Sequence, residues 1–263
     1  MNLGDVIGGF TLGEVVHRGG MAILRAATQP ELDVPILVKL PRLSEGEDPA
    51  AIVSFEMEQM ILPRLTGPHM PRCLGVGHDP LPWIAMERIQ GQSLLPMIEA
   101  LRRPIEEVVE LGATIAEALC ALHRQGVVHL DVKPSNLMQV DGRIILLDFG
   151  LSRHAQLPDL MEEEFRLPYG TAPFMAPEQM IGIRGDPASD LFALATMMYF
   201  FVTGRRPFGD PQRLSGLKRR LWWDPPPPRL PPLAAGGDPA QPRSGARKAP
   251  PHRRATGFRP APF

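Results

Sequence analysis

The chain has 263 residues, 44% of them apolar and 22% charged, which is typical of a globular protein with room for one large core or two lobes. Its formal net charge of -1 argues against general nucleic-acid or membrane-surface binding. Cys73 and Cys120 lie far apart without metal-ligand spacing, so we interpret both as thiols in a reducing compartment. Residues 1–5 do not resemble a signal peptide and no apolar run is long enough for a membrane span, so a cytoplasmic location is expected.

The first third of the chain has the pattern of β-strands interrupted by one helix. Strands are expected at residues 10–16, 23–27, 35–40 and 83–86, and a helix at residues 50–65. Pro63 predicts that this helix ends or bends by about Leu62. Residues 87–91 are expected to link this strand-rich part to the next.

The middle of the chain changes to helical periodicity. Apolar residues recur with a 3.6-residue period from Ile105 to His123, and the apolar run from Leu191 to Val202 indicates a buried helix. These patterns favour an α+β fold in which a small strand-rich part precedes a larger helical part.

The end of the chain has a different composition. Twelve of the 39 residues from Pro225 to Phe263 are proline, and from Arg213 onward there are eleven Lys and Arg residues but only two Asp residues. Such a segment cannot bury enough apolar surface to offset the entropy of ordering it. Residues 211–263 are therefore predicted to form a basic, Pro/Arg-rich disordered tail.

Two short motifs carry the chemistry. Asp131, Lys133 and Asn136 lie in one short stretch, and Asp148 follows twelve residues after Asn136, directly before a Phe-Gly pair. Phosphoryl transfer from ATP needs a carboxylate that orients a hydroxyl, a cation for the phosphoryl oxygens and two groups that hold Mg²⁺. Together the motifs resemble the catalytic loop and the metal-binding motif of the eukaryotic-type (Hanks-type) protein kinases, most closely their bacterial Ser/Thr branch.

This resemblance implies a fold, an activity and a role for each motif residue. The fold would be the two-lobed protein kinase fold at residues 8–210, with an N-lobe at about 8–87 that has one main helix and a helical C-lobe at about 91–210. The activity would be transfer of the ATP γ-phosphate to Ser or Thr hydroxyls of protein substrates, with Mg²⁺ or Mn²⁺ as cofactor. The implied roles are Asp131 as catalytic base, Lys133 as the cation for the phosphoryl group, and Asn136 and Asp148 as metal ligands.

The resemblance also implies nucleotide-binding positions in the strand-rich part. Lys39 and Glu58, nineteen residues apart, match the strand lysine and helix glutamate that pair in the family, whereas the alternative is a surface lysine and a solvated glutamate. Met86 would close the back of the adenine pocket, and residues 87–89 would offer backbone hydrogen bonds to adenine. The other implied nucleotide-binding residues, in and next to the glycine-rich loop and at the start of the hinge, are Val16, Gly19, Gly20, Leu24 and Glu87.

The sequence departs from the family pattern at three positions. His17 and Ala22 stand where the glycine-rich loop usually has glycine, which predicts weaker or altered ATP binding. Leu130 stands where most regulated members have an arginine that binds a phosphate on the activation loop. Activity is therefore expected not to depend on phosphorylation of that loop.

Two further features resemble the structural parts of these kinases. Residues 170–179 resemble the segment that shapes the peptide-acceptor site, in which Thr171 would bond the catalytic Asp and Lys. Asp190 resembles the buried aspartate that anchors the backbone of the catalytic loop from a central helix.

The resemblance stops near residue 210. The C-terminal helices of the fold, including the arginine that pairs with Glu178, have no counterpart, so Glu178 is expected to lack its partner. A one-base shift near residues 225–232 can yield peptides that look like those helices, which favours a frameshift. A basic tail that binds SH3-like domains or an acidic surface is the competing interpretation. The alternatives to an active enzyme are a pseudokinase-like binding protein and a truncated product that folds poorly.

Overall fold

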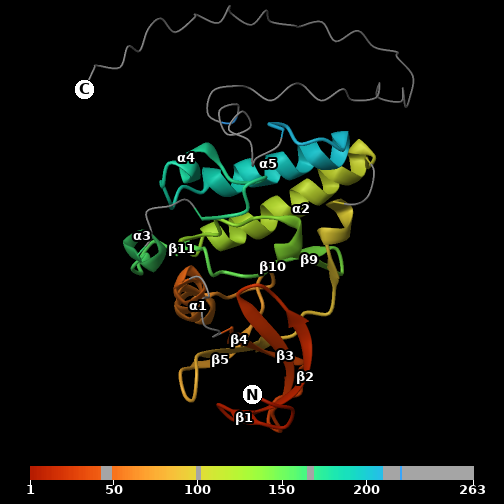
Figure 1. Cartoon of the computed structure of the whole chain (residues 1–263). Helices are drawn as coiled ribbons and strands as arrows, with labels where there is room; N and C mark the ends of the chain where they lie inside the picture. Colours follow the sequence, from red (N-terminus) through yellow and green to blue (C-terminus); the bar gives the residue numbers. More distant parts are fainter. Residues whose placement is uncertain (43–48, 99–101, 165–168, 210–219, 221–263) are drawn as a thin grey trace, which may run out of the picture. The chain divides into compact units, whose positions relative to one another are not determined.

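A computed structural model describes residues 1–42, 49–98, 102–164, 169–209 and 220 (Figure 1). Apart from Arg220, the predictions made for residues 211–263 lie outside the described residues, whether disorder, a frameshift or a binding tail. All described residues belong to one unit, residues 1–230. None of the helices described in this unit is both long and apolar enough to cross a membrane.

Six strands form one antiparallel sheet in the order β1-β2-β3-β4-β6-β5. The strands are β1 (Val6–Ile7), β2 (Phe10–Arg18), β3 (Ala22–Thr28), β4 (Ile36–Pro41), β5 (Cys73–Gly77) and β6 (Trp83–Glu87). The four predicted strands are confirmed as β2, β3, β4 and β6. The sequence pattern does not predict β1 or β5.

Strand β5 contains two glycines because the ring of Trp83 lies against it. A Cβ atom on Gly77 would lie 2.6 Å from ring atoms of Trp83, and one on Gly75 would lie 3.3 Å away. Phe10 meets the same ring edge-on, with the centroids 5.8 Å apart. Glycine weakens a strand, so β5 depends on its pairing with β6 and on this packing rather than on its own propensity.

One helix accompanies the sheet. Helix α1 (Pro49–Ile61) continues as a 3₁₀ turn, η1 (Leu62–Arg64), so the predicted end near Leu62 is confirmed. The Pro63 ring cannot continue an α-helix, which explains the change. α1 contacts β4, and its buried face contains Phe55, Met57 and the carboxylate residue Glu58.

The helical part follows the sheet. Its elements are β7 (Gln92–Ser93), η2 (Leu95–Ile98), α2 (Ile105–His123), β8 (Val127–Val128), η3 (Pro134–Asn136), β9 (Leu137–Val140), β10 (Arg143–Leu146), β11 (Arg153–His154), α3 (Leu160–Glu164), α4 (Pro177–Met180) and α5 (Ala188–Thr203). The two long helices, α2 and α5, pack side by side (Figure 1). The α2 bounds match the predicted ones, and α5 extends the predicted helix at both ends.

The packed interior consists of two hydrophobic clusters. One belongs to the sheet and centres on Phe10, Val38 and Trp83. The larger one runs from α1 through α2 and β9–β10 to α5, and it includes Phe149. The segment between β8 and η3, which carries Asp131, is thus flanked by elements of the larger cluster.

Candidate active site

Asp190, in the first turn of α5, holds the backbone of the loop that carries Asp131. Its Oδ1 accepts the Leu130 N–H at 2.8 Å, and its Oδ2 accepts the His129 N–H and His123 Nε2–H, each at 2.8 Å. Asp190 is only 1% exposed. Leu130 has φ +63°, a left-handed conformation that a branched side chain seldom adopts without such support. The predicted anchoring of the loop by Asp190 is confirmed in this geometry.

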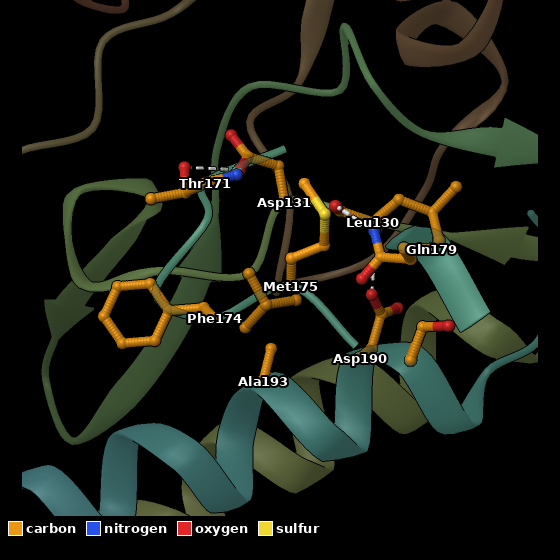
Figure 2. A pocket seen from close by; sticks show the side chains of 10 residues that line it. Leu130, Asp131, Thr171, Phe174, Met175, Gln179, Asp190 and Ala193 are labelled. Carbon is orange, nitrogen blue, oxygen red and sulfur yellow. Dashed lines mark hydrogen bonds between the residues drawn. The ribbon is translucent and has the colours of Figure 1, made fainter. Parts of the chain in front are cut away.

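Four donors fix the Asp131 carboxylate. Oδ1 accepts the N–H of Thr171 at 3.0 Å and its hydroxyl at 2.7 Å (Figure 2). Oδ2 accepts Lys133 Nζ at 2.6 Å and Asn136 Nδ2 at 3.1 Å. The predicted bond between Thr171 and Asp131 is therefore present, whereas Thr171 forms no hydrogen bond with Lys133 among the described residues. Donors to both oxygens hold the carboxylate in one orientation.

Asn136 and Asp148 leave oxygens for a cation. The Asn136 Nδ2 donates to the Asp131 backbone carbonyl at 3.0 Å as well as to its carboxylate, so the amide oxygen is the part left for a metal. Within the described ranges no group of three or more His, Cys, Asp or Glu side chains is placed to hold a metal ion. This donor set suits Mg²⁺, because Mg²⁺ commonly takes one or two protein carboxylates and completes its shell with phosphate and water oxygens.

Lys39, Glu58 and Asp148 come together from three elements that are distant in sequence. The Lys39 ammonium on β4 contacts the Glu58 carboxylate on α1, and it lies 3.1 Å from Asp148 Oδ1. The alternative of a surface lysine and a solvated glutamate is therefore wrong. The contact between Lys39 and Asp148 joins the sheet to the segment after β10. The lysine predicted to bind phosphates and the aspartate predicted to bind a metal therefore lie next to each other.

The charges of this trio depend on one another. Burial lowers the pKa of Lys39, but the Asp148 and Glu58 carboxylates outweigh burial and raise that pKa above its ordinary value. Burial raises the pKa of Glu58, which Lys39 partly offsets. The Lys39 charge lowers the pKa of Asp148, whose side chain is 48% exposed. Lys39 thus stays cationic and Asp148 stays anionic near neutral pH.

His129 and Phe149 connect the catalytic loop to the Asp148 segment. Their ring centroids lie 5.4 Å apart, and His129 Nε2 bonds the Leu147 carbonyl at 3.0 Å. The Leu147 N–H in turn donates to the Asn136 carbonyl at 2.9 Å. These contacts fix the spacing between Asp131 and Asp148, which both belong to the candidate site.

The glycine-rich loop is the hairpin between β2 and β3. At its tip the Gly19 N–H donates to the Ala22 carbonyl at 2.9 Å, and Arg42 donates to the Gly19 carbonyl at 3.2 Å. Leu24 pairs with Lys39 in the β3–β4 register. The other predicted residues of this loop, Val16 on β2 and Gly20 at the tip, lie on the same hairpin.

The hinge geometry narrows the expected adenine contacts. Met86 and Glu87 end β6, but the Glu87 N–H already donates to the Arg72 carbonyl at 2.9 Å, and the Arg88 N–H donates to the Pro35 carbonyl at 2.8 Å. Of the three residues expected to bond adenine, Ile89 keeps an N–H without a protein partner among the described residues. The N–H groups of Glu87 and Arg88 are thus engaged within the protein, and the expected backbone hydrogen bonds from residues 87–89 to adenine stay a prediction.

A small pocket with both polar and apolar lining lies between the acceptor segment, residues 170–179, and α5. Leu130, Phe174, Met175 and Ala193 contribute apolar atoms to it (Figure 2). Gln179 braces the same place, because its Nε2 donates to the Leu130 carbonyl at 2.8 Å and its Oε1 accepts the Ala176 N–H at 3.0 Å. Leu130, only 3% exposed, thus packs against the acceptor segment.

Glu178 has a partner that the sequence pattern does not reveal. The Ser189 hydroxyl donates to Glu178 Oε1 at 2.6 Å. No arginine is found beside Glu178 in the described part of the chain, and the Ser189 hydroxyl supplies a hydrogen bond instead. A serine directly before the anchoring aspartate gives no recognisable signal in the sequence.

Arg220 is the second residue that the sequence reasoning misses. It stands in a basic run beyond residue 210, where the resemblance was expected to stop, yet it is only 5% exposed and bonds the acceptor segment. Its position two residues before the tryptophan pair at residues 222–223 is a sequence signal for a buried place. A basic run near a Pro-rich segment, however, ordinarily indicates a solvated tail.

The comparisons with known proteins agree with this geometry. The sequence profile of the protein kinase domain matches residues 11–221, so the chain belongs to the protein kinase domain family. The match runs past the predicted boundary at residue 210 and includes Arg220. The resemblance to bacterial Ser/Thr kinases is confirmed by the relatives that follow.

Two curated relatives and one solved structure illustrate the match. A probable serine/threonine-protein kinase of Streptomyces coelicolor is 32% identical over 211 residues, which cover 77% of this chain and 31% of the relative. The serine/threonine-protein kinase PknB of Mycobacterium leprae is 30% identical over 209 residues, covering 76% and 33%. This chain thus spans about a third of the length of these relatives. The PknI kinase domain of Mycobacterium tuberculosis matches with a TM-score of 0.60 at 24% identity, covering 81% of this chain and 80% of that one, which confirms the predicted fold.

Proposed function

We propose that the chain is an ATP- and Mg²⁺-dependent protein serine/threonine kinase. The observation that carries this proposal is the orientation of Asp131, whose carboxylate is held by Thr171, Lys133 and Asn136 in the same structure that pairs Lys39 with Glu58 and Asp148. A protein that had lost catalysis would have no need to keep all of these side chains in mutual contact.

Each residue has a role that follows from its contacts. Asp131 orients the substrate hydroxyl and accepts its proton, while Lys133, 2.6 Å from Asp131, offers positive charge to the transferring phosphoryl group. Lys39, kept in place by Glu58, binds the α- and β-phosphates of the nucleotide. Asn136 and Asp148 would hold Mg²⁺, and the ion would supply positive charge for the phosphate oxygens.

A catalytically weak, pseudokinase-like binding protein is the second candidate, and the glycine-rich loop supports it. His17 and Ala22 replace glycines, and the Gly19 N–H is bonded to Ala22 rather than free for phosphate. The loop could thus donate fewer N–H groups to a nucleotide. This observation bears on the affinity for ATP more than on the reaction, because it leaves Asp131 and its partners unchanged.

The deciding experiment is transfer of labelled γ-phosphate from Mg·ATP to the protein itself and to a basic protein substrate. A basic substrate suits the domain, since residues 1–212 carry 27 acidic side chains against 17 Lys and Arg. Asp131→Asn should lower the rate by about 10²–10⁴-fold, the usual contribution of a general base. Asp141→Asn, an exposed residue with φ +47° that asparagine tolerates, is the matched control and should keep the wild-type rate. Absence of transfer by a folded wild-type protein would favour the binding protein.

A further inference from the structure

Arg220 reaches the acceptor segment with a buried guanidinium. Its Nη1 donates to the Ala172 carbonyl, and its Nη2 donates to the Pro173 carbonyl at 3.2 Å. Its Cζ lies 5.6 Å from the centroid of the Phe208 ring. Phe208 stacks on Phe192 of α5, with centroids 5.6 Å apart and planes inclined by 11°. A continuous set of contacts therefore leads from α5 to the backbone of residues 172–173.

The burial of a charged guanidinium at this position requires a physical explanation. None of the carboxylates in the described ranges forms an ion pair with Arg220, and burial lowers the pKa of its guanidinium. Burying an unpaired cation is costly unless its hydrogens find acceptors. Two backbone carbonyls accept from Nη1 and Nη2 and an aromatic ring faces the guanidinium, while the buried Nε has no partner among the described residues. An apolar side chain of similar length would fill the space at lower cost, so the hydrogen bonds to the carbonyls account for the arginine.

We infer that Arg220 is a positioning residue for the protein substrate: by holding the Ala172 and Pro173 carbonyls, it fixes the segment that presents Thr171 to Asp131. The inference rests on the proposed kinase function. Thr171 directly precedes the two clamped carbonyls, and it gives both its N–H and its hydroxyl to Asp131 Oδ1. Asp190 fixes the catalytic loop from α5, and Arg220 fixes the facing acceptor segment.

The proposed role of Arg220 concerns the protein substrate and not ATP. Lys39, Glu58 and Asp148, on the nucleotide side, make no bond to Arg220 or to the two carbonyls that it clamps. Loss of Arg220 should therefore weaken the use of the protein substrate and leave ATP binding nearly unchanged. A residue that served only to stabilise the fold would affect both.

Steady-state kinetics of Arg220→Met, Arg220→Lys and an Arg205→Met control test this separation. Arg205 is exposed, and its side chain forms no hydrogen bond or ion pair among the described residues. For Arg220→Met we expect the KM of a peptide substrate to rise about tenfold or more, since small displacements of a positioning group cost one to two orders of magnitude. The KM of ATP should stay within about twofold of the wild type. Arg220→Lys keeps the positive charge but cannot donate to both carbonyls with the planar geometry of a guanidinium. Its peptide KM should therefore lie between those of the wild type and Arg220→Met.

Hydrogen exchange gives a readout that does not require catalysis. In a folded Arg220→Met protein the amides of residues 171, 174 and 175 should exchange faster, while amides of α2 and α5 keep wild-type rates. If the wild type transfers no phosphate, the proposed function fails, and this measurement still decides the inference. Unchanged peptide KM and unchanged exchange in folded Arg220→Met would overturn it. An equal rise in the KM of ATP and the KM of the peptide, together with faster hydrogen exchange throughout the protein, would also overturn it. That result would identify a purely structural role for Arg220.

Discussion

Asp148 is the residue whose charge depends most directly on one neighbour, and this gives a test at the scale of a single side chain. Lys39 lowers its pKa below the ordinary value of 3.8. A carboxylate with a lowered folded-state pKa stabilises the fold at pH values above its unfolded-state pKa, and this stabilisation is lost as the pH falls through the folded-state value.

We therefore expect Asp148→Asn to be less stable than the wild type near pH 7, with a difference that shrinks as the pH falls below about 4. Urea unfolding at several pH values measures this. Asp141→Asn, exposed between β9 and β10, is the matched control and should show a smaller dependence. A difference that stays constant from neutral to acid pH would mean that Asp148 does not gain its stability from Lys39.

At the scale of elements, one carboxylate on α5 holds the catalytic loop. Asp190→Ala would leave the buried N–H groups of His129 and Leu130 without their acceptor, so we expect a loss of about 3–5 kcal/mol in the free energy of unfolding. Asp190→Asn should lose less, because its amide oxygen can still accept one of these bonds. Urea denaturation of both variants checks the order, and a loss below about 1 kcal/mol for Asp190→Ala would contradict the anchoring role.

The activation segment is the second element with a testable property. Of the three hydroxyl residues between Asp148 and Glu178, Ser152 is fully buried and donates to the His129 carbonyl at 3.1 Å, and Thr171 is bonded to Asp131. Leu130, unlike an arginine at this position, has no positive charge that could bind a phosphate on the activation segment. Both hydroxyls already have structural roles that a phosphate would disrupt.

Activity should therefore survive complete dephosphorylation. The measurement is the initial rate of transfer before and after phosphatase treatment, with mass spectrometry to verify removal of phosphate. Leu130→Arg should not create a phosphate-dependent enzyme, because the Leu130 side chain is only 3% exposed and an arginine forced into this packed place would destabilise the protein instead. A wild-type enzyme that loses its activity on dephosphorylation would show that the prediction is wrong.

At the scale of the whole molecule, the sequence predicts those elements whose own pattern is strong. The period of α2 gives its bounds, and Pro63 gives the end of α1. Strand β5 is not predictable in this way, because its two glycines make sense only once Trp83 is seen across the strand pair. Its stability comes from tertiary packing that no local pattern records.

The residues of the candidate site also divide into those that a local motif identifies and those that only tertiary packing brings into place. Motif spacing identifies Asp131, Lys133 and Asn136, because catalysis requires these side-chain types at these places. The bond from Ser189 to Glu178 joins residues 11 positions apart, and the two bonds from Arg220 to the acceptor segment join residues 47 and 48 positions apart. Nothing in the local sequence specifies these contacts. Partners of this kind are set by how the elements pack.

Two shortened chains test which part of the C-terminal region the kinase domain needs. Residues 225–263 have a composition that cannot support a packed core, and the family match ends at residue 221. A chain that ends at residue 224 should therefore unfold within about 2 °C of the full chain and phosphorylate a peptide at the same rate.

A chain that ends at residue 209 also loses Arg220, and two partly buried carbonyls then lose their donor. Leaving such groups unpaired costs about 1–3 kcal/mol, so its melting temperature should fall by at least about 3 °C and its peptide KM should rise. Calorimetry and steady-state kinetics on the two chains make the comparison. If the chain ending at residue 224 were already destabilised, the residues after it would contribute to the fold, and their interpretation as a disordered or frameshifted tail would be wrong. If both chains matched the full protein, the contacts of Arg220 would have no energetic weight.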